Sequence, residues 1–114
     1  MTRLKVKPES VCPVANAARL LGDRWTLVIL RDLAGGPMRF SELEESSGGI
    51  SPRTLADRLR EMEERGLITR ESFREIPPRV EYTLTEKGRD TLPVIEALRS
   101  FGRRWLPESE QQCC

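Results

Sequence analysis

The fold of this chain is decided by residues 41–84, which read SELEESSGGISPRTLADRLREMEERGLITRESFREIPPRVEYTL. Ser51 and Pro52 open a stretch with apolar residues at helical spacing, and serine favours the N-cap of a helix as proline favours its first position. A shorter helix is expected from Ser41, and the glycine-containing residues 46–49 separate the two. The sequence therefore predicts two helices joined by a tight turn.

The apolar period changes after Gly66. Residues 67–73 are typical of a strand, Pro77 and Pro78 resist regular structure, and residues 79–84 alternate between polar and apolar. Two strands joined by a short loop predict an antiparallel hairpin. The alternation predicts five inward-facing side chains: Leu67, Phe73, Val80, Tyr82 and Leu84.

Two helices are expected before this unit. The first begins at Pro13 and ends at Gly22, a residue that favours helix ends. The second covers residues 24–34, with Asp23 as its N-cap. Apolar side chains lie nearly all round this second helix, so it should be covered on several sides and lie at the centre of the fold.

Shorter elements complete the pattern. Residues 38–40 suit a minor strand, and Ser41 with Glu44 three positions later matches a capping box. Thr85 can cap a further helix that begins at Glu86. The expected class is therefore mainly α with a small β-hairpin wing, which is a winged helix-turn-helix.

One domain accounts for most of the 114 residues. Residues 12–106 form the predicted winged helix-turn-helix domain, including a terminal helix from Pro93 to about Leu106. Residues 1–11 are polar and basic and are expected to be a flexible arm, and residues 107–114 a flexible tail.

The two-helix unit with its hairpin suits duplex DNA, because the major groove admits one α-helix and the hairpin can lie along the adjacent backbone or minor groove. The N-terminal residues of the second helix would then reach the bases. Five candidates follow: Ser51, Arg53, Thr54, Asp57 and Arg58. Arginine can pair with guanine and aspartate with cytosine. The alternative is that these charges form a solvated, salt-bridged helix face.

Arg74 and Arg79 flank the tip of the hairpin, where a phosphate or a minor groove could be met. Of the two, Arg79 is the stronger candidate. Glutamates lie beside both, at positions 71, 75 and 81, so ion pairing within the hairpin is the alternative.

The terminal helix carries a narrow apolar seam with coiled-coil spacing: Val94, Leu98, Phe101 and Trp105. Such a seam in a chain of this size favours a partner subunit, although it could also pack within one chain. A two-fold homodimer would hold two recognition helices about 34 Å apart, one turn of DNA, on a pseudo-palindromic site.

Composition narrows the function classes further. The net charge is +1, so a DNA-binding surface requires that folding gather the arginines on one face. A winged-helix protein-interaction module remains the alternative. There is no histidine, Gly-rich phosphate loop or plausible nucleophile–base pair, so we expect no enzyme, metal or cofactor. No transmembrane span or signal peptide is recognisable, which favours the cytoplasm.

A set of short motifs then occurs in a characteristic order: Cys12-Pro13-Val14, Gly22-Asp23-Arg24-Trp25-Thr26-Leu27, Arg39-Phe40-Ser41-Glu42-Leu43, Gly49-Ile50-Ser51-Pro52-Arg53-Thr54-Leu55, Pro77-Pro78-Arg79-Val80-Glu81-Tyr82, Leu84-Thr85 and Gly88. In this order the chain resembles the HxlR-type (MarR-like) prokaryotic regulators. The resemblance implies a winged-helix dimer held by its terminal helices, acting as repressor or activator at one or a few promoters. The operator and any small-molecule effector stay unspecified.

The same resemblance implies a possible redox role for Cys12, because some members of the family sense oxidants or electrophiles through the cysteine at this position. Cys12 is also predicted to start the first helix, where the helix dipole favours a thiolate. The alternative is a small thiol that packs at the dimer interface. Cys113 and Cys114 lie outside the resemblance and could resolve an oxidised Cys12 of the partner subunit or have no role.

Overall fold

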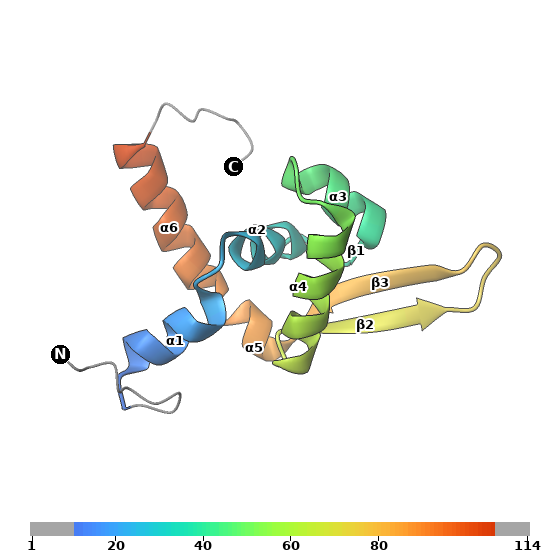
Figure 1. Ribbon diagram of the computed structural model, residues 1–114, viewed down its shortest axis with the longest axis horizontal. Helices are drawn as coiled ribbons and strands as arrows, with labels where there is room; N and C mark the ends of the chain where they lie inside the picture. Colours follow the sequence, from blue (N-terminus) through green and yellow to red (C-terminus); the bar gives the residue numbers. More distant parts are fainter. Residues whose placement is uncertain (1–10, 107–114) are drawn as a thin grey trace.

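The computed structural model describes residues 11–106, so the expected arm, apart from Val11, and the expected tail lie outside the described residues. Six helices and three strands follow one another along this part of the chain (Figure 1). Their bounds are α1 Pro13–Leu21, α2 Arg24–Leu33, β1 Met38–Arg39, α3 Phe40–Ser47, α4 Pro52–Glu64, β2 Ile68–Phe73, β3 Arg79–Leu84, α5 Glu86–Arg89 and α6 Leu92–Trp105.

Helix α2 lies at the centre, as its sequence predicts. Ile29, Leu30 and Leu33 are almost completely buried, and α2 contacts α3, α4, α6 and β3. The remaining core comes from α3, α4, β2, β3, α6 and the segments that lead into α4 and β2: Leu43, Ile50, Leu55, Leu59, Met62, Leu67, Ile68, Tyr82, Leu84 and Ile95. One hydrophobic core therefore joins the helices to the hairpin.

The strands form an antiparallel sheet in the order β1-β3-β2. The two-residue β1 pairs with β3 through Met38 opposite Tyr82, which confirms the predicted minor strand. The β2–β3 hairpin extends away from the helices and forms the wing (Figure 1). The fold is thus the predicted winged helix-turn-helix.

The register of the hairpin corrects one prediction. Phe73 lies opposite Arg79, and Val80 lies opposite Ser72. Because directly opposed residues share a face of the sheet and successive residues alternate, Phe73 lies on the other face from Val80, Tyr82 and Leu84. The prediction that it faces inward with them was wrong, because residue 73 stands an odd number of positions from the buried Ile68.

The predicted capping box was also misplaced. Helix α3 begins at Phe40, one residue before Ser41, and the Glu42 carboxylate accepts a hydrogen bond from the backbone N–H of Arg39 at 2.8 Å. The pairing of β1 with β3 ends at Arg39, so the chain leaves the sheet and enters the helix at this point. Strand pairing therefore decides where α3 starts, and Glu44 takes no part in the cap.

Among residues 11–106, no helix has the length and apolar character needed to cross a membrane.

Candidate nucleic-acid interface

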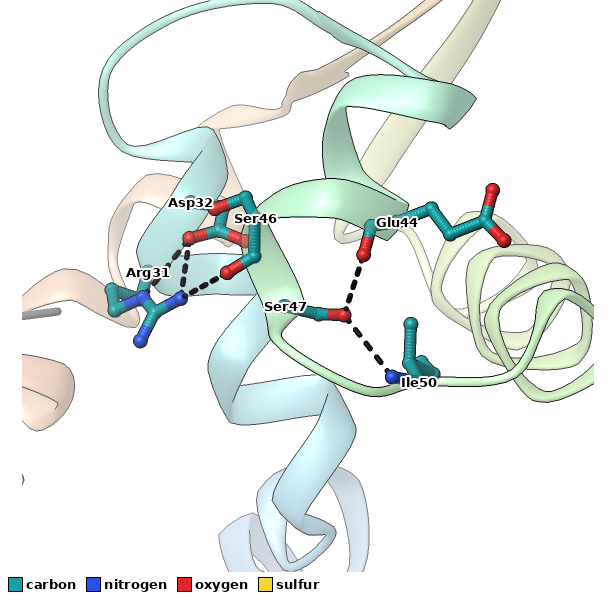
Figure 2. A network of polar contacts seen from close by, with 6 residues as sticks. All are labelled: Arg31, Asp32, Glu44, Ser46, Ser47 and Ile50. Atoms are coloured by element: carbon teal, nitrogen blue, oxygen red, sulfur yellow. Dashed lines mark hydrogen bonds and ion pairs between the residues drawn. The ribbon is translucent and has the colours of Figure 1, made fainter. Parts of the chain in front are cut away.

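The turn between α3 and α4 is fixed by backbone geometry and by one hydroxyl. Gly48 and Gly49 have φ angles of 78° and 145°, which favour glycine because side chains with a Cβ rarely adopt them. The Ser47 hydroxyl donates to the Glu44 carbonyl at 3.0 Å and accepts from the Ile50 N–H at 3.3 Å (Figure 2). The buried Ile50 then holds the end of the turn against the core.

A second contact joins α3 to the central helix. The Arg31 guanidinium donates to the Asp32 carboxylate at 2.8 Å and to the Ser46 carbonyl at 3.4 Å (Figure 2). A cation near the last carbonyls of a helix is favoured by the helix dipole. The last turn of α3 is therefore tied to α2 as well as to the turn that follows it.

Helix α4 presents one buried face and one exposed face. Leu55, Leu59 and Met62 are almost completely buried. Ser51 is the N-cap, and its hydroxyl accepts from the Thr54 N–H at 3.1 Å and donates to the Thr54 hydroxyl at 2.9 Å. The buried face anchors the helix, so its first turn is free to present polar groups to a ligand.

The predicted recognition residues divide into two groups in the structure. Ser51 and Arg53 are exposed at the start of α4, and Thr54 and Asp57 are partly exposed on the same half of the helix. Asp57 accepts from Arg60 at 2.8 Å, a pair one turn apart on the surface. These four side chains lie together at the N-terminal half of α4.

Arg58 lies elsewhere. Its Nε donates to the Asp23 carboxylate at 2.9 Å and its Nη2 donates to the same group at 3.3 Å. The hydrogen bonds from Arg58 hold the pKa of Asp23 below its usual value, and the carboxylate in turn raises the pKa of Arg58. The structure therefore brings Arg58 to the N-cap of α2 rather than to the other four candidates.

The two wing arginines also differ. Arg79 forms ion pairs with Glu75 at 2.9 Å and with Glu81 at 3.1 Å, and its guanidinium stacks 4.0 Å from the centre of the Phe73 ring. Arg74, by contrast, is exposed at the end of β2. These contacts give less support to the prediction that Arg79 is the stronger candidate for DNA contact, because its side chain is engaged within the hairpin.

The predicted apolar seam of α6 lies on the surface. Val94, Leu98, Phe101 and Trp105 are 43%, 47%, 60% and 61% exposed, whereas Ile95, about a quarter turn away round the helix, is buried against the core. Val14 of α1 is 77% exposed. Helices α1 and α6 lie at the end of the molecule away from the wing (Figure 1).

Cys12 is the N-cap of α1, as predicted. Its Sγ accepts from the Ala15 N–H at 3.4 Å, and the residue is exposed. Cys113 and Cys114 lie outside the described residues. Within residues 11–106, no three His, Cys, Asp or Glu side chains gather as they would around a metal ion.

Comparison with known proteins places this arrangement in a family. The sequence profile of the HxlR-like helix-turn-helix family matches residues 20–110, which span the central helix, the helix-turn-helix and the wing. The chain belongs to the HxlR-like helix-turn-helix family. It is thus a transcriptional regulator of the helix-turn-helix type, and the resemblance drawn from its motifs is confirmed.

Individual relatives agree with this assignment. An HTH-type transcriptional regulator from Synechocystis is 40% identical over 103 residues, which cover 90% of this chain and 76% of the relative. A solved structure described as a MarR-family regulator from Porphyromonas gingivalis has a TM-score of 0.82 at 36% identity and covers 86% of this chain and 96% of its own.

Solved redox-related structures are similar too. The reduced form of the regulator YodB from B. subtilis has a TM-score of 0.73 at 36% identity, covering 88% of this chain and 99% of its own. The redox regulator HypR in its oxidised form has a TM-score of 0.76 at 33% identity, covering 89% of this chain and 99% of its own.

Two features of the site had no clear signal in the sequence. The pairing of Asp23 with Arg58 joins residues 35 positions apart, and nothing local to either residue indicates it. The exposure of Val14 in α1 likewise has no signal in the residues around it. Spacing identifies a stripe of apolar residues but does not identify what covers it.

Proposed function

We propose that this regulator binds duplex DNA sequence-specifically, as a homodimer on a pseudo-palindromic operator. The observation that carries the proposal is the two-sided character of α4. Its inner side chains are anchored in the core, and its N-terminal end carries the exposed Ser51 and Arg53 with Thr54 and Asp57 beside them. A helix held in this way fits the major groove, where its first residues meet base edges.

Within this proposal, Arg53 and Asp57 read bases, and Ser51 and Thr54 contact bases or phosphates. Arg53 is exposed and extends from the first turn of α4, so it is the candidate for paired hydrogen bonds to guanine. Asp57 is partly engaged by Arg60, which would have to turn away for a contact with cytosine. Arg53 therefore carries most of the expected discrimination.

The wing supplies the second contact. Arg74 is the exposed cation near the tip, and we assign it to the backbone or minor groove beside the recognition helix. Arg79 can add to this contact only by exchanging its partners Glu75 and Glu81 for phosphate. The hairpin thus contributes mainly affinity, and α4 mainly sequence preference.

The dimer is proposed from the exposed apolar face of α6. Val94, Leu98, Phe101 and Trp105 together form a stripe that is costly to leave in water, and a second copy of α6 would cover it. Val14 of α1 is a further exposed apolar side chain. Because α1 and α6 lie at the end away from the wing, pairing there leaves both wings and both α4 helices open to DNA (Figure 1).

Cys12 is proposed as an oxidant sensor. It is an exposed thiol at the N-cap of α1. A structural neighbour, HypR, is described as a redox regulator in its oxidised form. Since a regulator of transcription must reach the chromosome, we place the protein in the cytoplasm.

The test is fluorescence anisotropy of the reduced protein titrated onto a labelled duplex from upstream of its own gene, beside a scrambled duplex, at two salt concentrations. Selective, salt-sensitive binding is expected, because phosphate contacts release counterions. Arg89→Ala, which removes an exposed arginine from α5, is the control for loss of positive charge. Absence of binding to either duplex at low salt would instead favour a protein-interaction module.

A further inference from the structure

The Asp23 carboxylate serves two helices at once. It accepts a hydrogen bond from the Thr26 N–H at 3.0 Å and another from the Thr26 hydroxyl at 3.3 Å, and so caps α2. It also accepts two hydrogen bonds from Arg58, in the middle of α4. One side chain therefore joins the corner between α1 and α2 to the proposed recognition helix.

A pocket of about 180 Å³ flanks this connection. Its lining includes the polar Asp23, Thr26, Arg58 and Glu61 beside the apolar Leu20, Met62 and Leu67. Apolar contact across α2 and α4 comes from the buried stripe that includes Leu55 and Leu59, on the inner side of α4. That stripe fixes the depth of α4 against the core and limits its rotation, because turning the helix would expose Leu55 and Leu59. The pair lies on the flank of the stripe and adds a polar restraint on rotation about the helix axis.

We propose that Asp23 is a positioning residue for DNA recognition, which acts by holding Arg58 and thereby fixing the rotation of α4 about its own axis. The proposal rests on the proposed function of α4. It removes Arg58 from the residues that contact DNA. It also gives a role in recognition to Asp23, which lies at the corner between α1 and α2. A rotation of α4 would move Arg53 relative to the base edges, so the pair affects sequence preference as well as affinity.

Charge makes the proposal sharply testable. Replacing a carboxylate with an amide raises the net charge by one, and electrostatics alone would tighten binding to any duplex. A positioning role requires the opposite effect, which is weaker binding to the specific duplex. Asp23→Asn is the best variant because the asparagine side-chain oxygen still caps α2, whereas the charge-assisted bonds to Arg58 are lost.

The experiment compares Asp23→Asn, Arg58→Gln, the double variant and the control Glu64→Gln, which removes an exposed carboxylate from the end of α4. Binding to the specific and scrambled duplexes is measured by anisotropy. Each single variant should weaken specific binding about fivefold. The double variant should be no weaker than either single, because the two residues act as one unit. Glu64→Gln should bind as tightly as the wild type or more tightly.

Hydrogen exchange of the α4 amides is measured on the same proteins without DNA. Exchange in the first turns of α4 should be faster in both single variants and unchanged in Glu64→Gln. If Asp23→Asn does not fold, Arg58→Gln and Arg58→Lys replace it, and the lysine variant, which keeps the charge and one hydrogen bond, should give the smaller effect.

Three results would overturn the proposal. Tighter specific binding by Asp23→Asn, with weaker binding by Arg58→Gln, would make Arg58 a DNA contact. Additive losses in the double variant would separate the roles of the two residues. Unchanged hydrogen exchange in α4 of the variants would exclude the positioning role, whether or not a duplex is bound. If the wild type binds no duplex but exchange in the variants is faster, only the proposed DNA-binding function is contradicted.

Discussion

Replacing Trp105 with alanine should separate the proposed dimer into monomers. Trp105 is 61% exposed in the single chain. A tryptophan side chain offers up to about 250 Å², so about 150 Å² is available for a partner to cover. At ~25 cal/mol per Å², complete coverage would contribute ~4 kcal/mol for each protomer. Association converts only part of this area into affinity, so about 2 kcal/mol for each copy is the working value.

Both copies carry the substitution, so the free energy of dimerisation should fall by about 4 kcal/mol, which weakens the dimer about 10³-fold. Sedimentation equilibrium over a range of protein concentrations measures this constant directly. Ile76→Ser is the matched control, because Ile76 is fully exposed in the turn of the wing and far along the chain from α6. An equally stable Trp105→Ala dimer, or a wild-type protein that is monomeric at every concentration, would refute the assignment of this face.

Four further outcomes are expected. Arg53→Ala should weaken specific binding by about 1–3 kcal/mol and relax preference at one base pair, whereas equal loss on specific and scrambled duplexes would make Arg53 a phosphate contact. Gly88→Ala should lower the free energy of unfolding by about 1–3 kcal/mol or more, measured by urea denaturation, because its Cβ would lie 2.2 Å from the backbone oxygen of Leu67. Cys12→Ser should make DNA binding insensitive to diamide, and retained sensitivity in that variant would place the sensor elsewhere. The lowered pKa of Asp23 means that its contribution to stability is complete above its unfolded pKa and is lost as the pH falls through the folded value. The difference in unfolding free energy between wild type and Asp23→Asn should therefore be constant, at ~1 kcal/mol or less, near neutrality and should shrink below about pH 4, and a difference that persists at pH 2 would contradict this origin.

Local signals in the sequence predicted α4 and the wing well. Ser51 and Pro52 define the start of α4 by their own conformational preferences, and the apolar stripe defines its inner face. The alternation of residues 79–84 likewise matches β3. These features need only neighbours in the chain, so one sequence contains enough information to identify them.

The remaining features depend on partners distant in the chain. The start of α3 is set by the pairing of β1 with β3, which shifts the cap away from Ser41. The face taken by Phe73 depends on the register between two strands, and a single-position offset reverses it. The contact between Arg58 and Asp23 requires α2 and α4 to be packed together first. For the same reason, an exposed arginine and an arginine engaged in an ion pair look identical in the sequence.

The division of α4 into an anchored and an exposed side also has an evolutionary consequence. Substitutions at exposed positions such as Arg53 leave the packing of Leu55 and Leu59 untouched, and changes of this kind usually alter stability by no more than about 0.5 kcal/mol. Under the proposed role of α4, a duplicated copy of this gene could therefore acquire a new operator by point substitutions on one side of a single helix. Retargeting would need no compensating change in the core, so closely similar folds of this kind can diverge quickly in the promoters that they control.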